Sequence, residues 1–456
     1  MKTTLFDTFS PISSKQWKQK IQFELDGADY NKTLIWNSPE GIPVKPFYHH
    51  DENQNVLQPT RKAESFQICQ PIFVHDLNKS IAKAKNALQR GAESLFFTIT
   101  TTECDVEKLL KELPLEGLKI YFDLQFLSID FAVKLDRIAE ENKCIVFINY
   151  DPIGQLAKDG NWFSTKENDN FLVLKKLNNG QLQHVNLLSV NGGLYQNAGA
   201  NIVQQIAYAL AHTNEYLNLI PDHKKTVVIQ LAVGSNYFFE IAKIRALRIL
   251  LDRIAQEYNS EISFHIIASP SKRNKTLYDY NVNMLRTTTE CMSAIIGGAD
   301  AIMNLPYDAI YHKNNEFGDR IARNQLLLLK NESYFDKVNN PADGSYYIEQ
   351  LTSQLAEKAL ILFKDIEKNG GFLRQLNEGT IKRKIQESAD KEQELFDSKS
   401  EILVGTNKYI NLDDRMKNET ELYPFVKIKP RKTLITPIIE KRLAEKLEQK
   451  RLESES

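Results

Sequence analysis

The chain has 456 residues, of which 42% are hydrophobic and 26% are charged, and its formal net charge is −1. This balance is typical of a soluble globular protein with a sizeable core, and it gives no overall field that would favour nucleic acid or an anionic membrane as a partner. Four widely spaced cysteines without a Cys-x-x-Cys pair fit neither a disulfide framework nor a zinc site, and the absence of a signal-like or membrane-spanning apolar run predicts a cytoplasmic protein.

Residues 1–60 are predicted to form an N-terminal arm and connector. A helical stretch follows Ser13, and its apolar residues recur every four positions, which indicates a single apolar stripe. That stripe consists of Trp17, Ile21 and Leu25. Pro43 and Pro46 then favour extended backbone, because the residue before a proline avoids the helical region.

Residues 61–350 alternate short β-branched or aromatic runs with stretches of helical period. Strands alternating with helices predict parallel pairing, and eight such strands predict an α/β fold of the closed (β/α)8 barrel type. A doubly wound open sheet is the competing architecture, and the lack of a Gly-x-Gly-x-x-Gly or phosphate-loop motif after any strand weakens it. The expected strands are Phe66–Val74, Ser94–Thr100, Leu118–Leu124, Cys144–Tyr150, His184–Val190, Thr226–Val233, Ile262–Ala268 and Ala301–Leu305.

The last hundred residues divide into two predicted parts. Residues 351–400 contain two helices, over Ser353–Glu367 and Leu376–Phe396, and residues 401–456 form an irregular tail with a terminal helix. Three apolar residues recur at four-residue intervals near the end and predict a face that docks on a surface. They are Ile439, Leu443 and Leu447.

The predicted strand ends are rich in Asn, Gly and Ser, which suit polar ligands but are also ordinary turn residues. They bring together no set of Asp, Glu, His or Lys for acid–base chemistry, and no Cys, His or Asp residues at metal-ligand spacing. His265, inside the seventh strand, has two readings that the sequence leaves open, a core histidine with one hydrogen-bond partner or a group that faces a ligand.

Seven segments together resemble the barrel domain of the adenosylcobalamin-dependent acyl-CoA mutases, and methylmalonyl-CoA mutase above all. The resemblance covers most of residues 1–395 in order, and it implies a barrel with an isomerase ancestry. The segments are Gly41–Tyr48, Gln196–Ala200, Ile241–Arg248, Leu285–Met292, Gly297–Asp300, Arg320–Gln325 and Asp343–Thr352.

Departures from the family pattern predict that this chain has no catalytic residues of its own. Where catalytic chains have a Tyr-His pair, this chain has Gly193-Leu194, and leucine donates no hydrogen bond to a thioester carbonyl. The family's polar pair after the strand histidine is replaced by Ile267-Ala268. The positions that the resemblance marks as a vestigial pocket are Asn191, Gln196, His265 and Asp300.

The sequence has no Asp-x-His-x-x-Gly loop, which in catalytic chains supplies the cobalt ligand of a flavodoxin-like module, and too few residues follow the barrel to build that module. The resemblance therefore implies a small subunit in a heterodimer, with adenosylcobalamin and the acyl-CoA substrate on the large catalytic subunit. One alternative is an active barrel of other specificity in a split mutase. A second is a chaperone or regulator that meets the mutase transiently.

Overall fold

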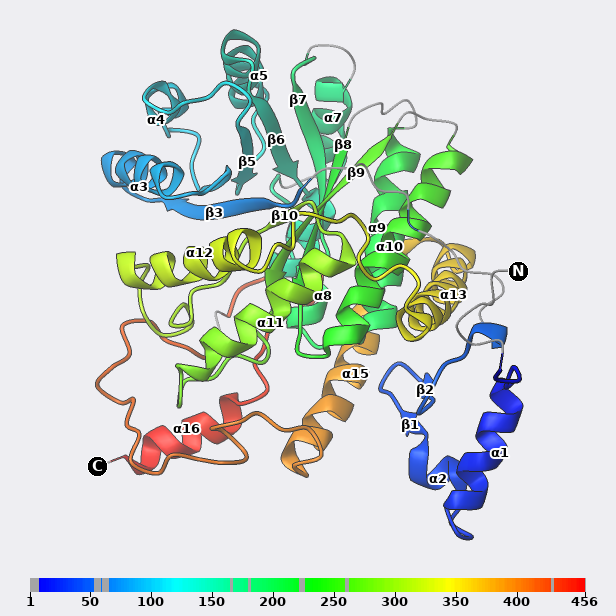
Figure 1. Cartoon of the computed structure of the whole chain (residues 1–456). Helices are drawn as coiled ribbons and strands as arrows, with labels where there is room; N and C mark the ends of the chain where they lie inside the picture. Colours follow the sequence, from blue (N-terminus) through cyan, green and yellow to red (C-terminus); the bar gives the residue numbers. More distant parts are fainter. Residues whose placement is uncertain are drawn as a thin grey trace.

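Eight parallel strands close into a barrel in the computed structural model, which describes residues 8–52, 59, 65–164, 167–178, 182–220, 226–258, 262–427 and 430–455 (Figure 1). The strand order around the barrel is β10-β3-β4-β5-β6-β7-β8-β9, and β10 pairs with both β9 and β3. That closure confirms the predicted (β/α)8 barrel and excludes the open sheet. The strands are β3 (Gln67–Val74), β4 (Ser94–Ile99), β5 (Lys119–Leu124), β6 (Ile145–Tyr150), β7 (Val185–Asn191), β8 (Thr226–Val233), β9 (Ser263–Pro270) and β10 (Ala301–Ile302).

Helices follow each strand and surround the barrel. The polar insertion after β6 contains two helices, and the last strand is shorter than the expected Ala301–Leu305, because only Ala301 and Ile302 pair with both neighbours. The helices of the barrel region are α3 (Leu77–Gln89), α4 (Val106–Lys111), α5 (Ile129–Asn142), α6 (Pro152–Asp159), α7 (Glu167–Lys176), α8 (Gly193–Asn197), α9 (Ile202–Leu219), α10 (Tyr237–Glu257), α11 (Val282–Gly297) and α12 (Glu316–Asn331).

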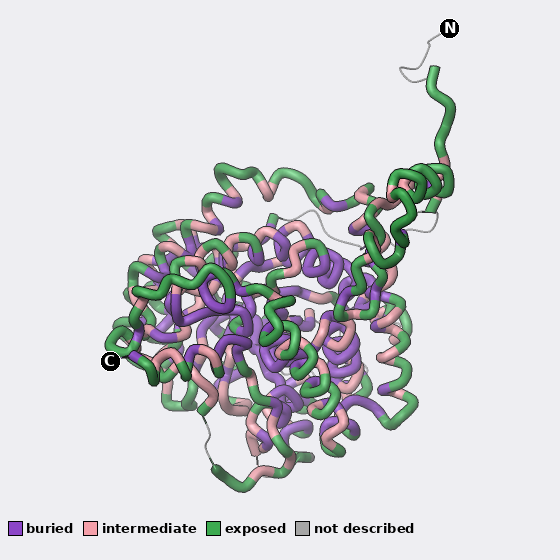
Figure 2. The backbone as a smooth tube through the Cα atoms, turned by 90° about the horizontal axis from the view of Figure 1, so that it is seen from below, coloured by how far each residue is buried: buried purple, intermediate pink, exposed green. Residues whose placement is uncertain are grey.

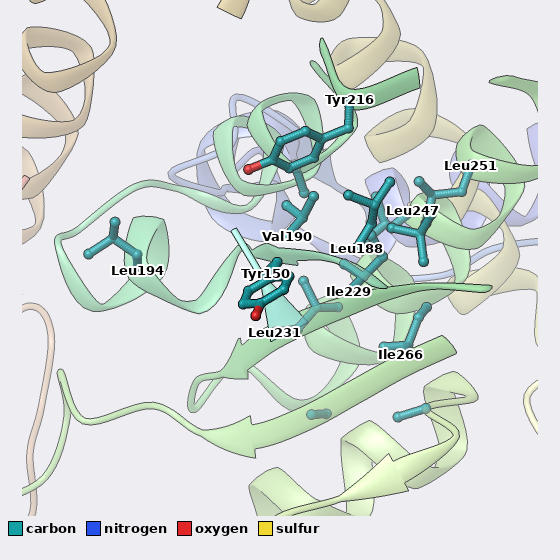
Figure 3. Packing of buried hydrophobic residues seen from close by; sticks show 14 of the residues in the cluster. Tyr150, Leu188, Val190, Leu194, Tyr216, Ile229, Leu231, Leu247, Leu251 and Ile266 are labelled. Atoms are coloured by element: carbon teal, nitrogen blue, oxygen red, sulfur yellow. The ribbon is translucent and has the colours of Figure 1, made fainter. Parts of the chain in front are cut away.

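The strands bury both of their faces, because side chains alternate between the barrel lumen and the surrounding helices. The outer core lies between strands and helices, and Figure 3 shows part of it, with Ile229 and Ile266 near Leu247 and Leu251 of α10. A separate inner cluster fills the lumen. Its members are Cys69, Phe96, Tyr121, Phe147, Val228, Ile267 and Ala301, with Met303 packed against them.

The N-terminal arm extends away from the barrel (Figure 2). It contains α1 (Ser14–Glu24), α2 (Tyr30–Leu34), the two-stranded pair β1 (Trp36–Asn37) and β2 (Pro43–Val44), and η1 (His50–Glu52). The helix predicted after Ser13 is present, and Ser13 caps it in a reciprocal pair of hydrogen bonds with Gln16. The β1–β2 pair contacts the body, because the ring of Trp36 lies 5.7 Å from that of Phe239 on α10.

Three helices follow the barrel and join its wall: α13 (Tyr346–Lys368), α14 (Phe372–Asn377) and α15 (Thr380–Asp397). The first of them begins earlier than predicted and packs against α9 and α10. The terminal helix α16 spans only Glu445–Ser454, so the predicted stripe is not on one helix. Leu443 precedes α16 and is buried against Phe396 and Leu403, whereas Ile439 is half exposed. No helix among these described segments is long and apolar enough to cross a membrane.

Candidate functional site

The barrel lumen is closed by a stack of aromatic rings, which includes one predicted site residue. The imidazole of His265 packs beside Tyr121 and Phe147, with ring centroids 5.6 and 5.1 Å away. Its Nε2 shares a 2.8 Å hydrogen bond with the hydroxyl of Tyr121. His265 therefore faces the lumen as a packed core group. The structure favours its interpretation as a core histidine over that as a group facing a ligand.

Asn191 and Gln196 both lie at the carboxyl-terminal end of the barrel, where enzymes of this fold place their chemistry. The side-chain oxygen of Asn191 accepts a 3.3 Å hydrogen bond from the backbone N–H of Leu194, which holds the loop after β7. Gln196, on α8, is buried, and its amide oxygen accepts a 3.0 Å hydrogen bond from Lys243. Both side chains are thus occupied by contacts within the chain.

A buried Lys–Glu pair on α10 lies behind Gln196. Lys243 is 1% exposed and forms an ion pair with Glu240, whose other oxygen accepts from the backbone N–H of Gly234 at 2.9 Å. Burial lowers the pKa of Lys243, and the attraction of Glu240 opposes that change. The sequence signal for this pair was a Glu and a Lys three residues apart within the apolar stretch of α10.

Gln196 and Glu240 also line a cavity of about 850 Å³ between the strand ends, the β1–β2 turn and α15. Its charged lining is mainly acidic, and its basic side chains are partly neutralised in place: Arg273, for example, pairs with Glu392 at 2.5 Å. A carboxylate or a phosphate therefore finds little unpaired positive charge there.

Asp300, the fourth predicted pocket residue, does not lie at this mouth. It immediately precedes β10, so it belongs to the amino-terminal end of the barrel. Its carboxylate accepts hydrogen bonds from Arg248 at 2.9 Å and from the backbone N–H of Ile266 at 2.7 Å. Asp300 is 4.0 Å from the His265 ring, so the four candidates form two separate pairs rather than one pocket.

A second network, which the sequence analysis missed, centres on Asp151 directly after β6. Its carboxylate contacts His212 at 2.9 Å and accepts from Tyr216 at 2.6 Å and from the Asn191 backbone N–H at 2.8 Å. Burial alone would raise the pKa of Asp151, but His212 and these hydrogen bonds outweigh it, so the pKa lies below its usual value. The network is inaccessible to substrate and fixes the ends of β6 and β7 against α9.

Gly193 and Leu194, at the family's Tyr-His positions, form the first turn of α8. Leu194 is 2% exposed and belongs to the outer core; it is labelled in Figure 3. A Cβ atom on Gly193 would lie 3.3 Å from the side-chain oxygen of Asn191 and 3.4 Å from the backbone of Ala232. The local packing therefore leaves little room for an aromatic side chain there.

The C-terminal tail, residues 399–455, runs across the carboxyl-terminal side of the barrel. Its backbone N–H groups donate to carbonyls in segments that follow four different strands. These bonds join Ile438 to Ala157 after β6 (2.7 Å), Lys441 to Asn197 after β7 (3.0 Å), Leu443 to Arg273 after β9 (2.9 Å) and Glu421 to Tyr311 after β10 (2.9 Å). The orange and red segments in Figure 1 lie at this end of the barrel, together with α8 and α11.

This arrangement does not fit a large planar cofactor stacked on the strand ends, because the tail already bonds to that surface. Nor do the segments that the structure covers hold a group of three or more His, Cys, Asp or Glu side chains placed to bind a metal ion.

The segments that carry the family resemblance form structural contacts. Glu290, on α11, makes a fully buried ion pair with Lys275 at 2.8 Å. Arg245, on α10, pairs with Asp343 just before α13 at 2.6 Å. Three of the segments that carry the resemblance therefore contribute to the packing of helices around the barrel.

The fold and the site define a (β/α)8 barrel whose strand ends have the position of an active site but whose polar groups pair with one another. Comparison with known families places the chain more closely: the model described as methylmalonyl-CoA mutase matches residues 98–450. The chain belongs to the methylmalonyl-CoA mutase family, which is a family of isomerases.

Two curated relatives are themselves named methylmalonyl-CoA mutase small subunit. One, from Porphyromonas gingivalis, is 33% identical over 91% of this chain and 72% of its own length. The other, from Streptomyces virginiae, is 29% identical over 72% of this chain and 56% of its own length. A methylmalonyl-CoA mutase from Rhizobium meliloti is 29% identical over 89% of this chain and 64% of its own length, so the chain spans about two thirds or less of most of these relatives.

Proposed function

We propose that this chain is the small, non-catalytic subunit of a heterodimeric methylmalonyl-CoA mutase, which interconverts methylmalonyl-CoA and succinyl-CoA in propionate metabolism. Adenosylcobalamin and the acyl-CoA substrate bind to the large catalytic subunit, and this chain supports the folding and solubility of that partner. The proposal has no role for nucleic acid or a membrane. Buried free thiols at Cys69, Cys144 and Cys291 support a reducing, cytoplasmic location.

The single observation that carries the proposal is the closed barrel. The aromatic stack around His265 fills the lumen, and the tail bonds to segments after four strands at the end where substrate would enter. Leu194 provides no hydrogen-bond donor at the family's histidine position and is packed in the core. A barrel with its interior filled and much of its mouth covered is poorly suited to bind a substrate, but its outer surface is still able to bind a partner protein.

The arm supports the presence of a partner. Trp17 and Phe23 on α1 are 51% and 81% exposed, and the arm projects from the barrel (Figure 2). Large exposed aromatic side chains grouped on one element are typical of protein interfaces.

The alternative function is the barrel subunit of a split mutase of other specificity, which would receive cobalamin from a separate domain. Such an enzyme needs a donor near the thioester carbonyl, and the observation against it is the replacement of that donor by Leu194. The two functions differ in whether this chain itself turns over substrate.

The test is co-expression of this chain with a full-length catalytic chain, followed by size-exclusion chromatography with light scattering. We expect a stable one-to-one complex with mutase activity, and neither activity nor tight adenosylcobalamin binding from this chain alone. Leu194→His, with Leu194→Gln as the control for polarity, should not create activity. Turnover by this chain with a separately supplied cobalamin domain would establish the split enzyme instead, and two chains that remain monomers when mixed would refute the subunit proposal.

A further inference from the structure

Four neighbouring strands end in a row of side chains on the lumen face of the barrel. Phe73 on β3 is paired in register with Thr98 on β4, and Thr98 with Asp123 on β5. Asn149 on β6 continues the row, because the residues two positions earlier on β5 and β6 are themselves paired and alternate residues share a face. The row therefore presents a ring, a hydroxyl, a carboxyl group and an amide side by side.

The face on which Asn149 lies follows from its neighbours in β6. Ile148 and Tyr150 both belong to the outer core, and Phe147 belongs to the lumen cluster, so Asn149 is on the lumen side. Its side chain is 3% exposed, yet neither its amide nitrogen nor its amide oxygen has a hydrogen-bond partner in the part of the chain that the structure describes. A buried amide without partners is costly, and such sites are ordinarily completed by water or a ligand.

Asp123 is the acid of the row, and no ion pair within the described segments reaches it. Its carboxylate accepts a 2.8 Å hydrogen bond from Gln125. Burial raises the pKa of Asp123 to about 6, and the more distant, exposed Lys158 only partly offsets that effect. The negative charge at this end of the lumen is therefore undercompensated.

Three residues of the row are open to solvent at least in part, whereas Asn149 is buried, and the row is closed from below. Phe73 is 60% exposed, and Thr98 and Asp123 are partly exposed, so solvent reaches this side of the mouth. One of the four tail bonds follows β6, and two follow β7 and β10, which are the neighbours of β6 and β3, so the tail flanks the row without bonding to the segments after β3, β4 and β5. Beneath the row, Tyr121 and Phe147 stack with ring centroids 5.0 Å apart and close the lumen.

We propose that this row binds a small organic cation with a primary ammonium group. The ammonium would donate hydrogen bonds to the Asp123 carboxylate and, once the buried Asn149 side chain turns toward it, to the Asn149 amide oxygen, while the exposed ring of Phe73 provides a face that attracts cations. The same carboxylate repels acyl groups that carry a negative charge. A single acid with an amide and a ring suits ammonium better than a metal ion, which needs several anionic or imidazole ligands. This inference is independent of the subunit proposal, so either can fail alone.

The experiment is isothermal titration calorimetry on the full chain with ethanolammonium chloride as the probe. Propionate and propanol serve as anionic and neutral probes of similar size. We expect saturable binding of ethanolammonium to one site and much weaker binding of the other two. Asp123→Asn should lower the affinity for ethanolammonium by at least about tenfold. Glu116→Gln, an exposed acid before β5, is the matched control and should leave the affinity unchanged.

Two further variants keep the test informative if Asp123→Asn does not fold. Asn149→Leu should fold, because it replaces an unpaired buried amide by an apolar group of similar size, and it should weaken ethanolammonium binding. Phe73→Leu changes an exposed position and should do the same. The proposal is overturned if propionate or propanol binds as tightly as ethanolammonium, if no probe gives saturable binding, or if Asp123→Asn leaves the affinity within about twofold.

Discussion

The two segments outside the barrel, the N-terminal arm and the C-terminal tail, both expose large apolar side chains, but they differ in how they are anchored. The tail is fastened by buried charges: Arg442 and Glu448 form an ion pair at 2.7 Å, with side chains 6% and 0% exposed. Glu448 also accepts a 2.7 Å hydrogen bond from the backbone N–H of Leu277, beyond β9. The arm instead leaves Trp17 and Phe23 largely exposed.

This difference indicates two different uses for segments that look similar in sequence. Both carry apolar residues at four-residue spacing in a charged background. That pattern alone predicts an apolar face that packs against another surface. In the tail this face is covered by the chain itself, since Leu443 is buried against Phe396 of α15 and Leu403 of the tail. In the arm the described residues cover this face only in part, since Trp17 packs against Phe47 yet remains 51% exposed, and we assign the remaining surface to the partner.

Glu448→Ala should have the largest effect on the stability of the isolated chain, because it removes a buried carboxylate that holds the tail to the rest of the chain. The variant leaves the buried Arg442 without its carboxylate and the Leu277 N–H without an acceptor. Breaking a buried pair from one side typically costs about 3–5 kcal/mol, so we expect a loss of that order in urea unfolding. Glu453→Ala, on an exposed part of α16, is the control and should change stability by no more than about 0.5 kcal/mol. Equal stability of the two variants would mean that the tail is only loosely held.

Acid should weaken the same side of the barrel through Asp151. This carboxyl has a folded-state pKa below its usual value, so its contribution is complete above the unfolded value of about 3.9 and is lost as the pH falls through the folded value. Asp151→Asn should therefore be less stable than the wild type at neutral pH, and the difference should shrink in acid. Urea unfolding midpoints from neutral pH down to about pH 3 measure this. A constant difference across that range would exclude Asp151 as the titrating group.

The barrel itself was predictable because its signals are local. Each strand has a run of β-branched or aromatic residues and each helix a 3.6-residue period, and eight such units imply closure. The boundaries of β10 and α16 were not predictable in this way. Only the pairing of Ala301 and Ile302 defines that strand, and the packing of Leu443 outside a helix depends on a surface more than forty residues away in sequence.

The candidate site was only partly predictable, because residue type does not reveal pairing. Asn191 and Gln196, which the resemblance marks, lie after β7 at the barrel mouth. Asp300 was grouped with them by family resemblance, although its pairing with Arg248 places it at the other end. His212 carries no sequence motif, and it is fully buried in a polar network that only the three-dimensional fold brings together.

Phe23→Ala should have the smallest effect on the isolated chain and still be the sharpest test of the comparison. Phe23 is 81% exposed on the arm, and Leu412 is 77% exposed on the tail, so the two form a matched pair. Neither truncation should change the unfolding free energy of this chain by more than about 0.5 kcal/mol, since little packing is lost. In the complex with the catalytic chain, Phe23→Ala should weaken binding by about 2 kcal/mol if the aromatic ring is a central contact, and Leu412→Ala should leave it unchanged. Titration calorimetry or surface-based binding measurements on both variants show which segment contacts the catalytic chain. A loss of affinity with Leu412→Ala alone would reverse the roles of arm and tail, because the tail would then be the segment that the partner covers.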